Sequence, residues 1–225
     1  MFADRLPLAV QYAALLAGPG TERGLLGPRE VPRLWDRHLL NCAVLTDLIP
    51  ERARVVDVGS GAGLPGLALA IRRPDLQVTL LEPLLRRTRF LQEVVETLGL
   101  EAVEVLRGRA EELHGQRSFE VVCSRAVAPL DRLLPWCMPL AERGGLVLAM
   151  KGKTAQQELD AASGTVQALG GRTPVVVHIG SNLLTFPTTA VRVEAGVDAP
   201  IRSGSGRGSA GSTRHSASRT RRSRR

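Results

Sequence analysis

The segment from Val55 to Gly66, which reads VVDVGSGAGLPG, constrains the fold of this chain more than any other feature. An apolar run leads directly into a glycine-rich turn, and helix-forming residues follow. Glycines permit positive φ and let a ligand approach the backbone closely. Pro65 suits the first turn of a helix, where its missing N–H costs little. A strand, a tight turn and a helix in this order predict an open α/β sheet, whose ligands bind at the carboxyl ends of the strands.

Strand-like and helix-like segments alternate through the rest of the chain. Apolar runs typical of strands buried on both faces cover residues 54–59, 77–82, 102–107, 119–124, 145–150, 174–179 and 189–193. Helical patterns lie between them at 66–73, 84–98, 128–141 and 155–169. This alternation predicts a Rossmann-like α/β fold, with a seven-stranded, mostly parallel sheet and helices on both faces.

Residues 1–50 precede the first predicted strand and lack strand character. Helical patterns cover 4–17 and 32–48, and a loop rich in glycine and proline is predicted from 18 to 28. We interpret residues 1–50 as a helical cap on the sheet and residues 51–196 as the ligand-binding domain. The cap is not expected to fold as an independent unit.

The net charge of +8 resides entirely in the C-terminal segment. Residues 202–225 hold eight arginines, seven serines, four glycines and no acid, so residues 1–201 carry equal numbers of basic and acidic groups. Such a composition buries too little apolar surface to offset its ordering entropy, and we expect 197–225 to be a disordered basic tail. One interpretation is an arm that contacts nucleic-acid phosphates. The other is a solvated extension without a selected role.

Several classes of protein are excluded or disfavoured by composition. No run of 18 apolar residues is present, and the N-terminus lacks a basic-then-apolar signal pattern, so we expect a cytoplasmic protein without a membrane span.

Cys42, Cys123 and Cys137 form no Cys-x-x-Cys pair and are interpreted as reduced core thiols. The histidines form no ligand-spaced cluster, so no metal site is predicted. Nothing indicates an obligate oligomer, and we expect a monomer.

Two cofactors compete for the glycine turn. The G-x-G-x-x-G spacing from Gly61, with Glu82 21 residues later, satisfies the dinucleotide fingerprint. However, the glycines nearest the strand are Gly59, Gly61 and Gly63, and Asp57 stands two residues before them. An acid-x-Gly-x-Gly-x-Gly turn is typical of S-adenosylmethionine (AdoMet) methyltransferases, because a carboxylate can hold the ammonium of that cofactor and is awkward beside a pyrophosphate. A tight turn without any ligand is the third interpretation.

Polar residues also follow the other strands at the same predicted edge. Glu82 is placed to accept both ribose hydroxyl protons of an adenosine cofactor, and Ala110 with Glu111 is placed to contact the adenine edge. The alternatives are a solvated acid at Glu82 and helix-start acids after the third strand. Arg125 provides a fixed cation where the fourth strand ends.

Five further cations are candidates for contacts with RNA phosphates. Arg86, Arg87 and Arg89 lie in the first turns of the predicted helix at 84–98, and Lys151 and Lys153 follow the fifth strand. A positive charge near a helix N-terminus is unfavourable by about 0.3–1 kcal/mol, because it opposes the helix dipole. Three arginines at this position are therefore unusual. For both groups the plainer interpretation is ordinary solvated charge.

Taken in order, these motifs resemble the RsmG (glucose-inhibited division protein B) family of class I AdoMet-dependent methyltransferases. The resemblance extends over residues 1–195 and is carried by segments 35–41, 57–66, 81–82, 86–91, 109–111, 124–126 and 151–152. It implies methyl transfer from AdoMet to N7 of a guanosine in the 530 loop of bacterial 16S rRNA, in the small ribosomal subunit. It also implies cofactor contacts at Gly59, Leu64, Ala110, Glu111 and Arg125.

The chain departs from this family's pattern in two places. The family's usual segment, a histidine followed by an Asp-Ser pair, reads His38-Leu39-Leu40-Asn41-Cys42 here, with asparagine replacing aspartate. The last strand ends at Glu194, where the family usually has basic residues, and we interpret the arginine-rich tail as taking over that electrostatic task.

The implied reaction needs alignment more than acid–base catalysis. Guanine N7 is a lone-pair acceptor without a proton, so no general base is required. Alignment of reacting groups can supply about 7–11 kcal/mol. We therefore expect Arg125 and Lys151 to position the guanosine or its phosphate. The alternatives are a methyltransferase acting on another RNA or a small molecule, a nicotinamide-dependent reductase, which Asp57 disfavours, and a non-catalytic RNA-binding protein, which Glu82 and the intact turn disfavour.

Overall fold

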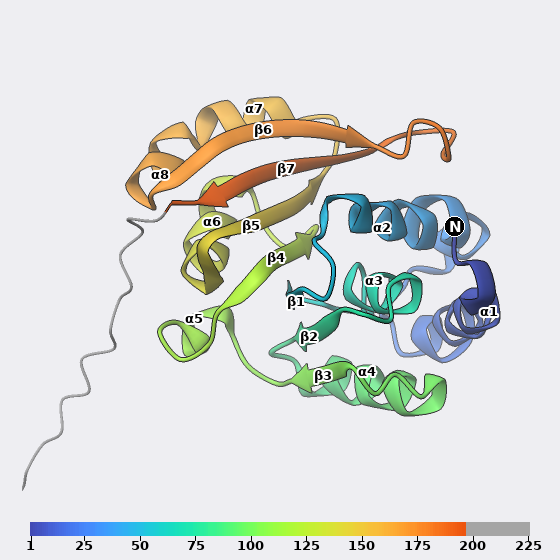
Figure 1. The fold of residues 1–225 in the computed structure, drawn as a ribbon. Coiled ribbons are helices and arrows are strands. Elements are labelled where there is room, and N and C mark those ends of the chain that lie inside the picture. The colour runs from blue at the N-terminus through green and yellow to red at the C-terminus, as the bar shows by residue number, and fades with distance from the viewer. Residues whose placement is uncertain (197–225) are drawn as a thin grey trace, which may run out of the picture.

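The computed structural model describes residues 1–196, and the predicted tail at 197–225 lies outside them. One seven-stranded sheet organises the protein, in the order β3-β2-β1-β4-β5-β7-β6 (Figure 1). Its strands are β1 Arg54–Val58, β2 Gln77–Leu81, β3 Val103–Leu106, β4 Phe119–Arg125, β5 Ala141–Lys151, β6 Gly171–Ile179 and β7 Thr188–Ala195. All seven predicted strands are confirmed, although β5 and β6 begin earlier than the apolar runs indicated.

Strands β1 to β5 pair in parallel, and β7 runs antiparallel to both of its neighbours. Since β6 is antiparallel to β7, the loop after β6 lies at the same edge as the carboxyl ends of β1 to β5. The strand order reverses between β1 and β4, and ligands of open α/β sheets bind at such a switch point. The fold therefore predicts a ligand-binding site at the turn after β1.

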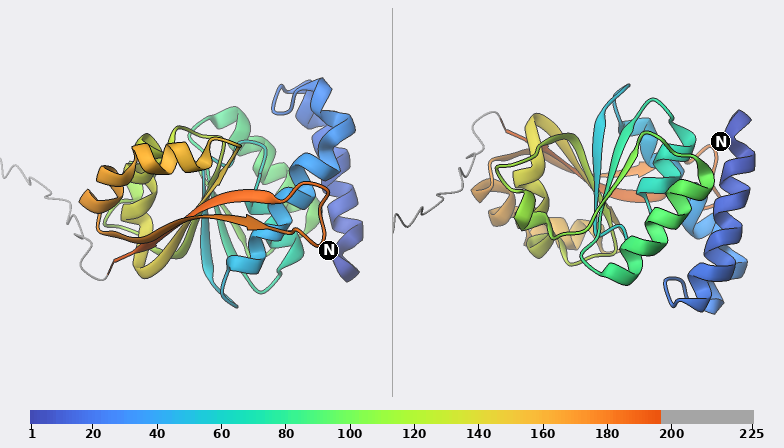
Figure 2. Two further views of the ribbon diagram at one scale, coloured as in Figure 1. Left: turned by 90° about the horizontal axis from the view of Figure 1, so that it is seen from above. Right: turned by 90° about the horizontal axis from the view of Figure 1, so that it is seen from below.

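Helices cover both faces of the sheet, as predicted (Figure 2). They are α1 Leu6–Leu15, α2 Leu40–Ala43, α3 Gly66–Arg72, α4 Leu85–Leu98, α5 Ala110–Leu113, α6 Leu130–Cys137, α7 Ala155–Ala161 and α8 Ser163–Ala168. Val55 belongs to the core under α3 and α4, and Val56 belongs to the core under α6 and α7. This alternation of side chains across β1 explains why its sequence is apolar throughout.

The cap is built of short helical turns rather than two regular helices. Besides α1 and α2, turns of 3-10 or π type cover Ala3–Arg5, Leu16–Gly20, Pro28–Arg33, Leu34–Leu39 and Val44–Leu48. The predicted loop at 18–28 is wrong in its first part, because helical backbone continues to Glu22. The wide turn at Leu16–Gly20 accommodates Pro19, which cannot donate the usual backbone hydrogen bond.

The cap shares its core with the sheet domain. Tyr12 and Leu16 are fully buried in the same cluster as α3 and α4, against which α1 packs. A second contact joins the cap to the last strand, where the Thr188 hydroxyl lies 2.9 Å from the Asn41 backbone oxygen and 3.0 Å from its Oδ1. Residues 1–50 are thus an integral part of the fold.

The predicted core thiols and the helix expected at 155–169 can both be located in the structure. Cys42, Cys123 and Cys137 are all buried and free, which confirms their interpretation as core thiols. The helix expected at 155–169 is divided at Ala162 into α7 and α8. Within residues 1–196, no helix combines the length and hydropathy needed to cross a membrane.

Candidate functional site

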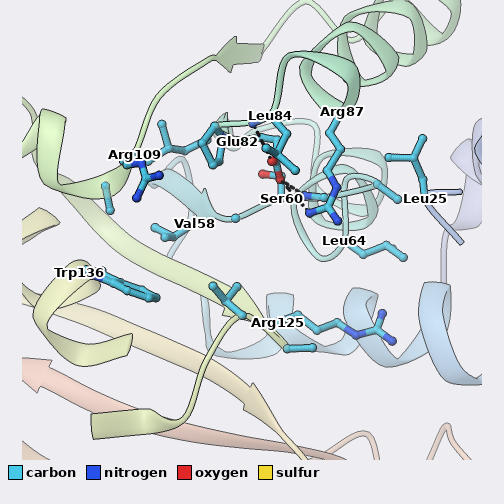
Figure 3. A pocket seen from close by; sticks show the side chains of 18 of the residues that line it. Leu25, Val58, Ser60, Leu64, Glu82, Leu84, Arg87, Arg109, Arg125 and Trp136 are labelled. Atoms are coloured by element: carbon cyan, nitrogen blue, oxygen red, sulfur yellow. Dashed lines mark hydrogen bonds and ion pairs between the residues drawn. The ribbon is translucent and has the colours of Figure 1, made fainter. Parts of the chain in front are cut away.

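A cavity of about 600 Å³ opens above the turn after β1, at the predicted edge of the sheet (Figure 3). Cavities of this size suit a cofactor or a drug-sized ligand. Its lining includes most of the predicted cofactor residues: Gly59, Gly61, Leu64, Glu82, Ala110, Glu111 and Arg125. Asp57 and Gly63 are the exceptions, and of the predicted RNA-contacting residues it includes Arg87. The structure therefore gathers these residues from the carboxyl ends of four strands, β1 to β4, and the segments that follow them.

The glycines of the turn have different tasks. Gly59, Gly61 and Gly63 all have positive φ, at 74°, 60° and 99°. The first two face the cavity, whereas a Cβ on Gly63 would lie 2.2 Å from Leu67 Cδ1 and 2.9 Å from the Tyr12 hydroxyl. Gly63 therefore allows the turn to pack against α3 and the cap, and Gly59 and Gly61 expose backbone to a ligand.

Glu82 is a buried carboxylate held in one position on the cavity wall. Only 1% of the residue is exposed. Its Oε2 accepts the Gly61 N–H at 2.9 Å and its Oε1 accepts the Leu84 N–H at 3.0 Å. Arg87 Nη1 lies 3.7 Å from Oε2 (Figure 3). Each carboxylate oxygen has a further lone pair, so Glu82 can still accept hydrogen bonds from a ligand.

Asp57 lies beneath the turn and is fully buried. Its Oδ2 accepts the Gly66 N–H at 2.9 Å, and its Oδ1 has no hydrogen-bond partner within residues 1–196. Burial raises the pKa of this carboxyl to about 7, against the opposing effect of the Gly66 N–H. An unpaired buried carboxylate oxygen is unfavourable unless a positive group lies near it. The site therefore fits a cofactor that carries a cation, such as AdoMet, better than it fits a dinucleotide.

Arg125 extends from the end of β4 toward the cap. Its Nη1 donates to Cys42 Sγ at 3.2 Å, and its Nη2 donates to the Arg37 backbone oxygen at 3.1 Å and to His38 Nδ1 at 2.7 Å. His38 Nε2 in turn lies 2.9 Å from Glu30 Oε2. The predicted site residue Arg125 is thus held by three groups of the cap.

The asparagine at position 41 has a structural explanation. Its Oδ1 lies within hydrogen-bond distance of the Thr188 hydroxyl, and its Nδ2 donates to the Arg37 backbone oxygen at 3.4 Å. An aspartate could provide only the acceptor. Asn41 therefore joins the last strand to the backbone oxygen that also accepts from Arg125.

The predicted cationic residues lie in different environments. Arg86, Arg89 and Lys153 are exposed, whereas Arg87 is half-buried at the cavity. Lys151 is turned inward, with 7% of its side chain exposed. Its Nζ donates to the Ala128 backbone oxygen at 2.6 Å and lies 2.8 Å from Glu158 Oε2. We therefore revise the role expected for Lys151 from substrate positioning to stabilisation of the loop after β4.

Replacing Lys151 with methionine is expected to lower the free energy of unfolding by about 1–3 kcal/mol, because the Ala128 oxygen and Glu158 lose a buried charged partner. Lys153→Met, at an exposed position, is the matched control and is expected to change it by less than about 0.5 kcal/mol. Urea unfolding of the two variants measures the difference. Equal stabilities would contradict the structural role of Lys151.

Sequence reasoning missed the apolar wall of the cavity and its histidine. Leu25 and Leu26 come from the segment predicted as loop, Trp136 comes from α6, and His38 comes from the cap. Only His38 carried a usable signal, since its segment belongs to the motif at 35–41. Within residues 1–196, His, Cys, Asp and Glu form no group of three or more suited to a metal ion.

The fold is similar to those of solved methyltransferases. A methyltransferase from Pyrococcus furiosus has a TM-score of 0.54 at 14% identity, over 70% of this chain and 83% of that chain. The precorrin-6y C5,15-methyltransferase of Geobacter metallireducens has a TM-score of 0.50 at 13% identity, over 75% and 89%. At such low identity these similarities show the fold alone, and they confirm the predicted class I methyltransferase architecture.

The sequence is similar to one named family over most of its length. The family model described as GidB, rRNA small subunit methyltransferase G, matches residues 5–185, which include the whole cavity lining. A relative from Nocardioides sp. is 62% identical over 191 residues, 85% of this chain and 76% of the relative. One from Streptomyces coelicolor is 57% identical over 197 residues, 87% of this chain and 82% of the relative. Both bear the name Ribosomal RNA small subunit methyltransferase G.

Proposed function

Since this chain belongs to the GidB family of rRNA small subunit methyltransferases, we propose that it transfers a methyl group from AdoMet to N7 of a guanosine in the 530 loop of bacterial 16S rRNA. The observation that carries the proposal is the cavity bounded by Gly59, Glu82 and Arg125, in a chain more than half identical to relatives of that name. The protein is proposed to act in the cytoplasm, as a monomer, on the small ribosomal subunit.

The residues in and beneath the cavity would contact different parts of the cofactor. Glu82 would accept the ribose hydroxyls, and Ala110 with Glu111 would contact the adenine. Asp57, which lies beneath the turn and outside the cavity lining, would supply negative charge for the ammonium through its unpaired oxygen. When bound, AdoMet supplies a methyl group attached to a sulfonium centre.

The environment of His38 and Arg125 suits a reaction that removes no proton. N7 of guanine offers a lone pair without a hydrogen. Both ring nitrogens of His38 are already engaged, by Arg125 and by Glu30. Arg125 retains its Nε–H and one Nη1–H, which make no hydrogen bond within residues 1–196, and these can orient a nucleotide or the cofactor. Alignment of this kind can contribute about 7–11 kcal/mol.

Contacts with the RNA backbone are proposed around the cavity entrance. Arg86 and Arg89 lie at the start of α4, which follows the carboxyl end of β2, and Lys153 follows the carboxyl end of β5. All three are exposed, at the edge of the sheet where the cavity opens. Together with the arginines of 202–225, they would supply affinity that is independent of sequence.

The proposed reaction is tested by methyl transfer from labelled AdoMet to small subunits that lack this modification, followed by nucleoside analysis. Label in 7-methylguanosine is expected, and strand cleavage at that nucleoside locates it within the rRNA. Label in another nucleoside would overturn the N7 assignment. No label in subunits or naked rRNA, from protein that binds AdoMet, would overturn the substrate and leave the cofactor assignment standing.

Removing residues 202–225 is expected to weaken RNA binding and to flatten its dependence on salt. For every phosphate of single-stranded RNA that the tail no longer neutralises, the slope of log K against log salt decreases by about 0.7. AdoMet affinity is expected to stay unchanged. A variant with lysine at all eight arginine positions keeps the charge and serves as the control, with a slope near that of the full chain. An unchanged slope after truncation would show that the tail makes no phosphate contacts.

A further inference from the structure

The Arg125 side chain is oriented by hydrogen bonds that differ in kind. The Arg37 oxygen and Cys42 Sγ accept from it, and neither changes charge near neutral pH, because burial raises the pKa of the Cys42 thiol. The third acceptor is His38 Nδ1, at 2.7 Å, the shortest of the three contacts. Only the histidine contact depends on a group that gains a proton near physiological pH.

The hydrogen-bond pattern assigns the proton on His38. A guanidinium can only donate, so Nδ1 must be the acceptor and carries no hydrogen. The proton of the neutral ring is then on Nε2, which donates to Glu30 Oε2 at 2.9 Å. Glu30 thereby selects the tautomer that presents a lone pair to Arg125. His38 also lines the cavity, so this pair lies within the proposed active site.

We propose that His38, oriented by Glu30, is a positioning residue that fixes the Arg125 guanidinium for cofactor binding and methyl transfer. The inference rests on the proposed function and names two residues of the cap that serve it. His38 contacts Arg125 and not the reacting atoms, so its effect on the reaction passes through the guanidinium.

The charges around His38 determine how this arrangement responds to pH. Arg125 faces the ring from β4, Glu30 faces it from Pro28–Arg33, and Arg37 is on its own turn. Burial and the two arginines lower the pKa of His38, and Glu30 raises it, with a net decrease from 6.5. A protonated ring would place a donor and a positive charge against Nη2 and break the contact. The arrangement therefore holds at neutral pH and is lost only as the pH falls through the lowered pKa of His38, which lies below the ordinary value of 6.5.

Two substitutions separate the halves of the histidine ring. His38→Asn keeps an acceptor near the position of Nδ1, whereas His38→Gln keeps a donor near the position of Nε2. His38→Ala removes both the acceptor and the donor. Arg125→Ala removes the guanidinium itself and gives the largest loss of affinity that this contact can cause. His178→Asn, at an exposed histidine on β6, is the matched control.

S-adenosylhomocysteine affinity of the protein alone, measured by calorimetry between about pH 5 and 8, gives a readout that needs no RNA. We expect about tenfold weaker binding for His38→Ala and His38→Gln at neutral pH, substantial recovery for His38→Asn, and an unchanged profile for His178→Asn. Wild-type affinity is expected to decline on acidification more steeply than that of His38→Asn, because only the wild-type protein can protonate the ring. Asp57 titrates in the same window, but it does so in both proteins, so the difference between them isolates His38.

Methyl transfer by the same variants is expected to follow the order of their affinities, with thermal stability close to wild type. Wild-type affinity in His38→Gln, or equal losses in His38→Asn and His38→Gln, would overturn the positioning role. Failure of the proposed function looks different: no RNA is methylated by any variant, while the differences in S-adenosylhomocysteine affinity persist.

Discussion

Replacing Glu82 with glutamine is expected to weaken AdoMet binding about 100-fold, the largest effect on affinity that we expect from a single atom-for-atom change. The carboxylate is buried and accepts backbone hydrogen bonds from both Gly61 and Leu84. An amide has one acceptor oxygen, so one of these N–H groups would face an NH₂. Losing the charge also weakens the bonds to ribose hydroxyls. Hydrogen bonds to charged groups contribute about 1.5–3 kcal/mol each, and 1.4 kcal/mol is about a factor of ten.

Calorimetric titration with S-adenosylhomocysteine measures this loss. Glu96→Gln, at an exposed position on α4, removes the same charge from the neighbouring helix and is expected to leave the affinity unchanged. The free energy of unfolding of Glu82→Gln should also decrease, by about 1–3 kcal/mol, because a backbone N–H is left without a partner. If Glu82→Gln bound S-adenosylhomocysteine as tightly as Glu96→Gln does, the proposal that Glu82 contacts the cofactor would be wrong.

Asp57→Asn is expected to stabilise the protein above neutral pH while weakening its affinity for AdoMet. The carboxyl has a pKa of about 7 when folded, raised from 3.8 by burial. A carboxyl with a raised pKa opposes folding increasingly as the pH rises from about 4 to 7, and the effect is constant above that range. At about 1.4 kcal/mol per pKa unit, the full effect is about 4 kcal/mol. The amide keeps the acceptor for the Gly66 N–H and never ionises.

Urea unfolding at several pH values tests this expectation. The two proteins should have similar stability near pH 4, and Asp57→Asn should be the more stable by up to about 4 kcal/mol near pH 8. Asp160→Asn, at an exposed position on α7, is the control and should follow the wild type. A difference independent of pH would contradict the raised pKa, and unchanged AdoMet affinity would contradict the role of Asp57 toward the ammonium.

The sheet could be predicted because its strands are apolar on both faces. Val55 and Val56 point into different cores, and the sequence carries that requirement without any tertiary information. The cap was harder to predict. Pro19 and its flanking glycines predict that the helix ends there, whereas the wide turn at Leu16–Gly20 keeps the backbone helical. Packing of Tyr12 and Leu16 against the sheet domain outweighs the local preference.

The site could be predicted where the motif and the strand ends coincide, as at Gly59 and Glu82. Lys151 shows the limit of this reasoning, because its position at a strand end says nothing about the direction of its side chain. The ammonium turns inward to Glu158, a residue of the following helix. His38 could not be assigned from its segment alone, since its partner Arg125 lies 87 residues away.

The contact between Asn41 and Thr188 spans 147 residues and has a consequence for synthesis of the protein. Within residues 1–196, β7 is the last strand in chain order, yet it lies between β5 and β6 in the sheet. During translation, the edge of β5 therefore stays unpaired until residues 188–195 have emerged from the ribosome. The cap must wait equally long for its contact with Thr188. An unpaired edge strand is prone to wrong association, so a nascent chain that has not yet reached residues 188–195 exposes such an edge on β5.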